Sequence, residues 1–291
     1  MLESLPLANL ANVAKQSTRA LVIDLHNVES DLVAQEAQRQ QDPATCHAIK
    51  TRARRIAALE QRAAALADAL WVCSSIDRDR LVSDGADAKR IYVVPNGIPR
   101  PESVQDWPQR KDDRWPPTLL FIGHLSYPPN IYAALALVEL MPALWNRIAG
   151  ARLVLAGRNP HPVISRRSQP GKIDVVANPS STSALLSSAH LAVMPLQQGG
   201  GTRIKALEAI AWGLPVVATA RAVEGLQLED GVHVRIAESA SAFVTAVYDL
   251  CENSTLYESQ RIAAQRHVMS NFGPEAIRRA VHAGLRLVLR S

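Results

Sequence analysis

The sequence predicts an α/β fold of two domains, each built on a parallel sheet with helices on both faces. Short apolar segments of strand length alternate with helical stretches along most of the 291 residues, a pattern typical of doubly wound sheets. A proline-rich segment without periodicity, residues 98–117, divides the chain and reads as a linker. We expect a first domain over 1–100, a linker over 101–117 and a second domain over 118–291.

The first domain is expected to contain three strands. The apolar segments lie at 19–27, 67–75 and 90–97. A helical stretch rich in Ala, Gln and Arg follows the first of them and is interrupted at Pro43, because proline removes a helix hydrogen bond. A short helix is expected between the second and third strands.

The second domain is expected to contain six strands, most of them separated by helical stretches. The apolar segments are TLLFIG (118–123), ARLVLAG (151–157), KIDVVA (172–177), LAVMP (191–195), PVVAT (215–219) and VHVRIA (232–237). Strands that alternate with helices predict a parallel sheet, which binds ligands beyond the carboxyl ends of its strands.

Composition excludes several classes of protein. Apolar residues make up 47% and aromatic residues 4%, so aliphatic cores are expected. The net charge of +5 is small for this length, and no aromatic-interleaved basic patch predicts nucleic-acid binding. Cys46, Cys73 and Cys251 are odd in number and far apart, which favours a reduced, cytoplasmic compartment. Neither a standard signal peptide nor an 18-residue apolar run is present.

The stretch GGGTRIKALEAIAWGLPVVAT has the composition of an anion site. Gly199 to Gly201 form a loose turn, and apolar spacing predicts a helix that begins near Thr202 and stops at Gly213. The amino end of a helix offers free N–H groups and positive potential, which phosphate uses. Arg203 and Lys205 lie in that first turn, where cations are unfavourable unless an anion is the partner. The alternative is a plain turn with two solvated basic residues.

Glu208 lies one helical turn after Lys205. A salt bridge between the two explains it adequately. The alternative is that Glu208 accepts hydrogen bonds from ribose hydroxyls, as acids do in other nucleotide-binding folds. Neither G-x-G-x-x-G after a strand nor G-x-x-x-x-G-K-[ST] occurs in the chain.

Several segments then match a known family in the right order. They are VVPNGI (93–98), LLFIGHLSYPPN (119–130), LVLAGRNP (153–160) and PLQQGGGTRIKALEAIAWGLPVVAT (195–219). The chain resembles the retaining glycosyltransferases of family 4, which have the GT-B fold of two Rossmann-like doubly wound domains. DLHNVES (24–30) resembles the acceptor-domain strand whose histidine, here His26, approaches the transferred sugar.

The resemblance implies functional residues position by position. Glu208 matches the second acid of the family's E-x7-E motif, which holds the ribose, whereas the position of the first acid is Gly200. The family's diphosphate-binding Arg and Lys fall at His124 and Asn130, so Arg203 and Lys205 would carry the phosphate charge. The implied catalytic residues are His26, Arg203 and Lys205. The implied donor-binding residues are Gly123, His124, Asn130, Gly199, Gly200, Gly201, Thr202 and Glu208.

The resemblance also implies a reaction. A sugar passes from a nucleotide-sugar donor to a glycan, lipid-linked or small-molecule acceptor, with retention and without a metal or other cofactor. Compared with the family, the first domain lacks its glycine-rich opening strand and loop, so we expect it to be incomplete and transfer by this chain to be weak or absent. The alternatives are a non-catalytic nucleotide-sugar-binding partner subunit and a nucleotide-sugar 2-epimerase.

Two charged clusters have ordinary interpretations. Asp77 and Asp79 mimic a metal-binding D-x-D, but an exposed face of a short helix explains them better. A basic helical stretch is expected to be solvated, with peripheral contact to the anionic inner membrane surface as the alternative. Its residues are Lys50, Arg52, Arg54, Arg55 and Arg62.

Overall fold

The structure, a computed structural model, describes residues 1–98, 116–201 and 203–289. All of the expected linker except residues 116 and 117 lies outside these ranges. The chain forms two compact units. The first unit consists of Met1–Gly97, Gln198–Thr202 and Pro274–Ser291, and the second of Ile98–Gln197 and Arg203–Gly273.

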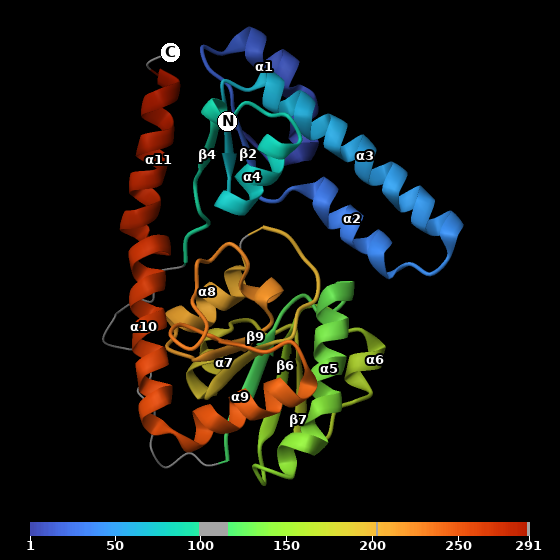
Figure 1. The fold of residues 1–291 in the computed structure, drawn as a ribbon, viewed down its shortest axis with the longest axis vertical. Coiled ribbons are helices and arrows are strands. Elements are labelled where there is room, and N and C mark those ends of the chain that lie inside the picture. Colours follow the sequence, from blue (N-terminus) through green and yellow to red (C-terminus); the bar gives the residue numbers. More distant parts are fainter. Residues whose placement is uncertain (99–115, 202, 290–291) are drawn as a thin grey trace. The chain divides into compact units, whose positions relative to one another are not determined.

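The first unit contains a parallel four-stranded sheet (Figure 1). Its strands lie in the order β1 (Leu2–Glu3), β2 (Val22–Leu25), β3 (Ala69–Val72) and β4 (Ile91–Val93). The last three are the predicted strands, which are confirmed. The two-residue strand β1 was not predicted, because nothing in its length or pattern distinguishes it from a loop.

Helices of the first unit cover both faces of this sheet. Ile23 and Leu70 face one apolar cluster, whereas Val22 and Trp71 face another that includes Val288. This alternation follows from the two-residue period of a strand. The helices are η1 (Leu5–Leu10), α1 (Ala11–Ser17), α2 (Glu29–Arg39), α3 (Pro43–Leu66), α4 (Ser75–Ser83), η2 (Ala88–Arg90) and α11 (Pro274–Leu289).

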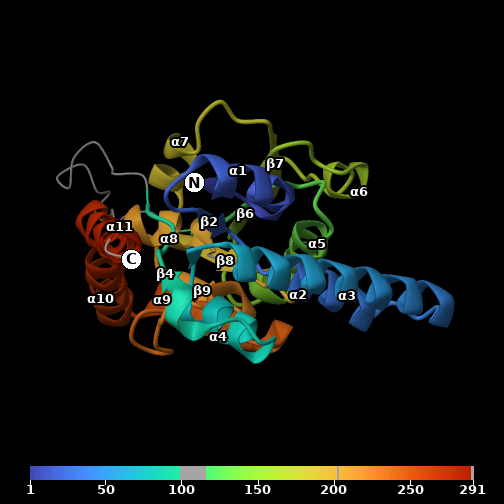
Figure 2. The same cartoon turned by 90° about the horizontal axis from the view of Figure 1, so that it is seen from above.

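The helices α2 and α3 form a hairpin and lie side by side in both views (Figures 1 and 2). Pro43 separates them as predicted, and it occupies the first turn of α3, where its missing N–H costs nothing. The Asp42 side chain accepts a 2.8 Å hydrogen bond from the Thr45 N–H and caps the helix.

The second unit contains a parallel six-stranded sheet whose strands are the six predicted ones. Their spatial order is β10-β9-β8-β5-β6-β7. The bounds are β5 (Thr118–Ile122), β6 (Arg152–Gly157), β7 (Ile173–Ala177), β8 (Leu191–Met194), β9 (Val216–Ala218) and β10 (Arg235–Ile236).

Helices cover the two faces of this sheet because its strand order runs in opposite directions from the centre. The connection from β5 to β6 moves one way and that from β8 to β9 the other, so right-handed crossovers place their helices on opposite faces. Accordingly, α5 packs with α9 and α8 packs with α10. The helices are α5 (Pro128–Trp145), α6 (Pro162–Ser165), α7 (Ser183–Ser188), α8 (Ile204–Ala211), η4 (Ala220–Val223), α9 (Ala240–Glu252) and α10 (Ser254–Phe272).

The core of the second unit is aliphatic, as the composition predicts. Leu119, Leu137, Met141 and Leu155 are fully buried around Phe121. Across the ranges that the structure describes, no helix combines the length and apolar character needed to cross a membrane. Cys46, Cys73 and Cys251, all within the described ranges, form no disulfide.

Candidate nucleotide-binding site

The predicted donor residues of the second unit cluster where its strand order reverses. The central strands β5 and β8 are neighbours, yet their following helices lead in opposite directions. Such a switch point leaves a crevice at the carboxyl ends of the two strands, the usual ligand position in open α/β sheets. Gly123 and Asn130 follow β5, and Arg203 and Lys205 follow β8.

Lys205 reaches from α8 to the turn after β5. Its ammonium donates a 2.6 Å hydrogen bond to Asn130 Oδ1 and lies 5.0 Å from the centre of the Phe121 ring. Gly123 leaves room for this contact, because a Cβ there would lie 3.0 Å from the Asn130 side chain and 3.2 Å from Lys205 Nζ. The cation is therefore held at the switch point by an amide oxygen and an aromatic face, both uncharged.

The surroundings of Lys205 disfavour its positive charge. Burial, reinforced by the charge of Arg203, lowers the pKa of Lys205 from 10.5 to about 8. Arg203 itself is only 7% exposed, and its Nε donates to the carbonyl of Arg221 at 3.2 Å. The partly buried Lys205 and the buried Arg203 repel each other, and a phosphate group beside Lys205 would offset that repulsion.

Asn130 positions the turn as well as the cation. It is 6% exposed, and its Nδ2 donates to the carbonyl of His124 at 2.9 Å. The His124 side chain is exposed, with Nε2 3.0 Å from Ser126 Oγ. Asn130 thus lies where the resemblance places a family cation, but it fixes Lys205 there instead of supplying charge.

Glu208 has a partner that the sequence did not indicate. Its Oε1 accepts a 2.9 Å hydrogen bond from Thr182 Oγ1, and Thr182 is the residue before α7. The sequence left a salt bridge between Glu208 and Lys205 as one interpretation. No ion pair between them occurs in the described part of the chain, where Lys205 donates its hydrogen bond to Asn130 instead. The other carboxylate oxygen of Glu208, Oε2, takes no part in this hydrogen bond.

The glycine turn is placed with the first unit. Gln35 of α2 accepts a 2.9 Å hydrogen bond from the Gly199 N–H and donates one of 3.2 Å to its carbonyl. A Cβ at Gly201 would lie 2.2 Å from Asn27 Oδ1, and one at Gly200 would lie 2.8 Å from Leu32 Cδ2. Close packing therefore accounts for these glycines, and their contact with a donor stays a prediction.

Two further predicted residues have different outcomes. His26 follows β2 in the first unit and its side chain is exposed, so it is accessible to a ligand. Thr202 lies outside the described residues. The predicted start of the helix near Thr202 is confirmed to within two residues, since α8 begins at Ile204.

Asp77 is not on an exposed helix face, so that part of the sequence interpretation was wrong. It is 3% exposed, and its carboxylate accepts a 2.6 Å hydrogen bond from Ser74 Oγ, whose oxygen caps α4 by accepting from the Asp77 N–H. Asp79 is exposed and lies 3.5 Å from Arg78. Within the described residues, no group of three or more His, Cys, Asp or Glu side chains is arranged to hold a metal ion.

The comparison with family models identifies this segment of the chain. Residues 116–253 match the family described as glycosyl transferases group 1. The match covers β5 to β10 and therefore includes the switch point with Lys205, Asn130 and Glu208. The predicted resemblance to the GT-B glycosyltransferases is confirmed. No curated protein matches the chain significantly in sequence.

Solved structures share the fold at low sequence identity. TarM of S. aureus is 12% identical with a TM-score of 0.66, and the match covers 92% of this chain and 50% of TarM. HepE of Anabaena in complex with UDP is 16% identical with a TM-score of 0.67, covering 96% of this chain and 76% of HepE. The pneumococcal O-GlcNAc transferase GtfA in complex with UDP and GlcNAc is 14% identical with a TM-score of 0.69, covering 96% and 54%. The chain spans about half the length of TarM and GtfA, and the fold is of the GT-B class.

Proposed function

We propose that the chain acts as a glycosyltransferase that takes a sugar from a nucleotide-sugar donor and passes it to an acceptor with retention and without a metal. The observation that carries this proposal is the partly buried ammonium of Lys205 beside Arg203, held by neutral groups at the switch point of the second sheet. A phosphate group would add a charge-assisted hydrogen bond to this ammonium, and a nucleoside diphosphate supplies one. The HepE and GtfA structures contain UDP, which makes a UDP-sugar the first donor to test.

The proposed reaction breaks the bond between the anomeric carbon and the diphosphate oxygen. The leaving nucleoside diphosphate takes the electron pair, and Lys205 and Arg203 stabilise the charge that develops on it. The acceptor hydroxyl attacks from the same face and gives its proton to the leaving phosphate oxygen, which retains the anomeric configuration. In this scheme Glu208 holds the ribose, and His26 of the first unit contacts the sugar.

The direct experiment is to incubate the full chain with a panel of nucleotide sugars and follow its thermal stability. A donor present at a hundred times its dissociation constant should stabilise the folded state by about 2.7 kcal/mol. The effect should persist in EDTA if no metal is needed, and released nucleoside diphosphate should be measured with and without candidate acceptors. The absence of stabilisation by every nucleotide sugar would reject the proposal, and a strict Mg²⁺ or Mn²⁺ requirement would reject its metal-free form.

Affinity for UDP is expected to fall as the pH rises through about 8. The pKa of Lys205 is lowered to about 8, mainly by burial, so the free protein loses this charge in that range. The terminal phosphate, whose second pKa is near 6, stays ionised. Well above pH 8, binding that takes up one proton should weaken by up to about tenfold per pH unit. Calorimetric titration from pH 7 to 9.5 measures this slope.

The same lowered pKa has a consequence for the ligand-free protein. Between about 8 and 10.5 the unfolded chain keeps the Lys205 proton while the folded chain has released it. The contribution of Lys205 to stability therefore rises with pH across this window and is lost as the pH falls through about 8. A pH-independent UDP affinity in a protein that otherwise folds normally would contradict the placement of Lys205 at the phosphate.

Glu208→Gln is expected to weaken UDP more than 2′,3′-dideoxy-UDP. A carboxylate that accepts from two ribose hydroxyls loses about 1.5–3 kcal/mol when one charged hydrogen bond is impaired. Thr182→Val should act in the same direction by about 0.5–1.5 kcal/mol, because it frees the Glu208 carboxylate from a neutral hydrogen bond that orients it. Thr182→Ser, which keeps the hydroxyl, is the matched control. Titration with the two nucleotides gives the comparison, and equal losses for both would remove ribose from the role of Glu208.

A further inference from the structure

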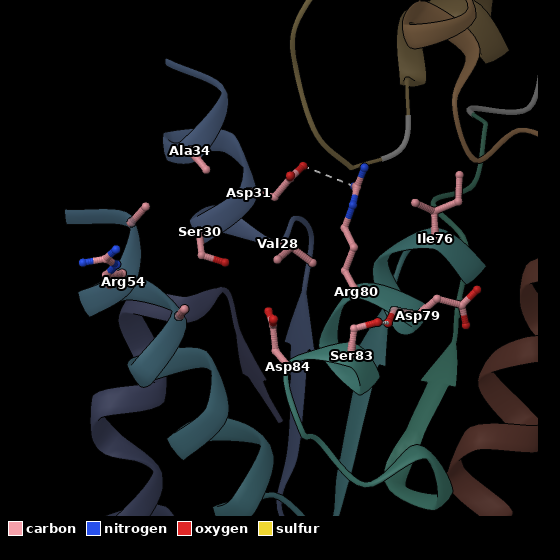
Figure 3. Close-up of a pocket in the computed structure, with 12 residues that line it drawn as sticks. Val28, Ser30, Asp31, Ala34, Arg54, Ile76, Asp79, Arg80, Ser83 and Asp84 are labelled. Atoms are coloured by element: carbon pink, nitrogen blue, oxygen red, sulfur yellow. Dashed lines mark hydrogen bonds and ion pairs between the residues drawn. The ribbon is translucent and has the colours of Figure 1, made fainter. Parts of the chain in front are cut away.

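The first unit contains a pocket between α2, α3 and α4 (Figure 3). Its volume is about 550 Å³, within the range of small-molecule sites. The space exists because small side chains line it where the helices face each other, namely Ala34 of α2 and Ala53 and Ala57 of α3. These residues play no part in the proposed nucleotide site.

The walls of the pocket are fixed by a buried contact. Glu60 of α3 is 1% exposed and accepts hydrogen bonds from the backbone N–H of Ser30, at 3.2 Å, and from its hydroxyl. Burial raises the pKa of Glu60. This contact ties the first turn of α2 to α3 beside the pocket, so the cavity is held open before any ligand arrives, which lowers the cost of binding.

The charges around the pocket disfavour an anion. Five charged residues line it: Asp31, Asp79, Asp84, Arg54 and Arg80. The Asp79 carboxylate points away from the pocket (Figure 3) and lies 3.5 Å from Arg78, which leaves the carboxylates of Asp31 and Asp84 beside it. Arg80 lies 3.4 Å from Asp31 and 3.6 Å from Asp77, so its charge is already met by carboxylates. A phosphate group would therefore meet more negative than positive charge.

The same groups suit a ligand with many hydroxyls. Carboxylates accept hydrogen bonds from hydroxyl groups and the Arg54 guanidinium donates to their oxygens, while Val28 and Ile76 offer apolar surface for C–H groups. We propose that this pocket binds an uncharged sugar. That the sugar belongs to the acceptor rests on the proposed function, whereas the binding itself rests on the pocket alone.

The test is saturation-transfer NMR on the full chain with methyl α-D-glucoside, methyl α-D-mannoside and N-acetylglucosamine as probes. We expect at least one of the three to bind, and glucose 6-phosphate to bind at least threefold more weakly than methyl α-D-glucoside. Ala57→Leu fills the pocket and should reduce sugar affinity at least tenfold. Ala58→Leu makes the same change at the next, exposed position of α3, outside the pocket, and should have no effect.

A second pair of variants keeps the test decisive if Ala57→Leu disturbs folding. Arg54→Ala removes a lining guanidinium and should weaken the sugar, whereas Arg55→Ala changes an exposed neighbour that does not line the pocket. Affinity for UDP should be unchanged in all four variants. The pocket proposal is overturned if none of the three sugars binds, or if the lining variants bind them as tightly as the native protein does. Failure of the native chain to bind UDP would instead reject the proposed function.

Discussion

Lys205→Met is expected to weaken UDP binding roughly ten- to hundredfold, the equivalent of about 1.5–3 kcal/mol for a lost hydrogen bond to a charged group. Methionine keeps most of the volume and the contact with the Phe121 ring but removes the charge that Lys205 holds 2.6 Å from Asn130. Calorimetric titration at pH 7 measures the loss. Arg203→Met should act in the same direction and by a similar amount.

The stability of the Lys205→Met variant separates a binding role from a structural one. A partly buried ammonium among neutral groups opposes folding, and the lowered pKa corresponds to a cost on the order of 3 kcal/mol. The free energy of unfolding should therefore be unchanged or higher, since an apolar replacement of a buried ion is often neutral or stabilising. A variant that loses stability along with UDP affinity would indicate that Lys205 holds the fold together.

Lys172→Met is the matched control. The ammonium of Lys172 also lies over an aromatic ring, 5.4 Å from the centre of Trp145, but Lys172 precedes β7 and so belongs to the amino end of the same sheet. The two variants lose the same charge, and in both the methionine keeps an apolar contact with the ring. UDP affinity should fall in one and not in the other. Equal affinity losses would mean that the net charge of the unit, and not the switch point, governs binding.

The strands other than β1 could be predicted because each is a short apolar run whose ends are marked by glycine, proline or polar residues. The segment LAVMP became β8 and PVVAT became β9, with the helix between them beginning where the glycines end. The donor residues could be placed only as a group, because a parallel sheet brings its carboxyl ends together. Which residue bonds to which depends on distances between segments that lie far apart in the sequence.

Three contacts show what sequence reasoning lacked. Thr182 bonds to Glu208 across 26 residues, and Gln35 bonds to Gly199 across 164; neither pair follows a local spacing rule. Asp77 looked exposed because its neighbours are charged, yet it turns inward to Ser74. The periodicity of a nine-residue helix with a weak apolar face could not assign that side chain to the interior.

Gly157→Ala is expected to destabilise the second unit by about 2–6 kcal/mol, from backbone strain and overpacking together. Gly157 ends β6 with φ +149°, a conformation that other residues rarely adopt, and its Cβ would lie 1.7 Å from the carbonyl oxygen of Gly123. The added methyl would push on the peptide that begins the turn to His124 and Asn130. Urea unfolding followed by circular dichroism measures the loss of stability.

Gly171→Ala is the control for strain without a collision. Gly171 has φ +76°, and an added Cβ would meet nothing within 4 Å, so it should cost roughly 1–2 kcal/mol. The additional loss of stability in Gly157→Ala measures the close approach of β6 to the turn after β5.

The folded fraction of Gly157→Ala in buffer without urea should also bind UDP more weakly, because Lys205 would lose the Asn130 oxygen at its present position. Equal losses of stability in the two variants would show that the turn after β5 moves aside for the methyl group. The position of that turn would then not depend on its packing against Gly157.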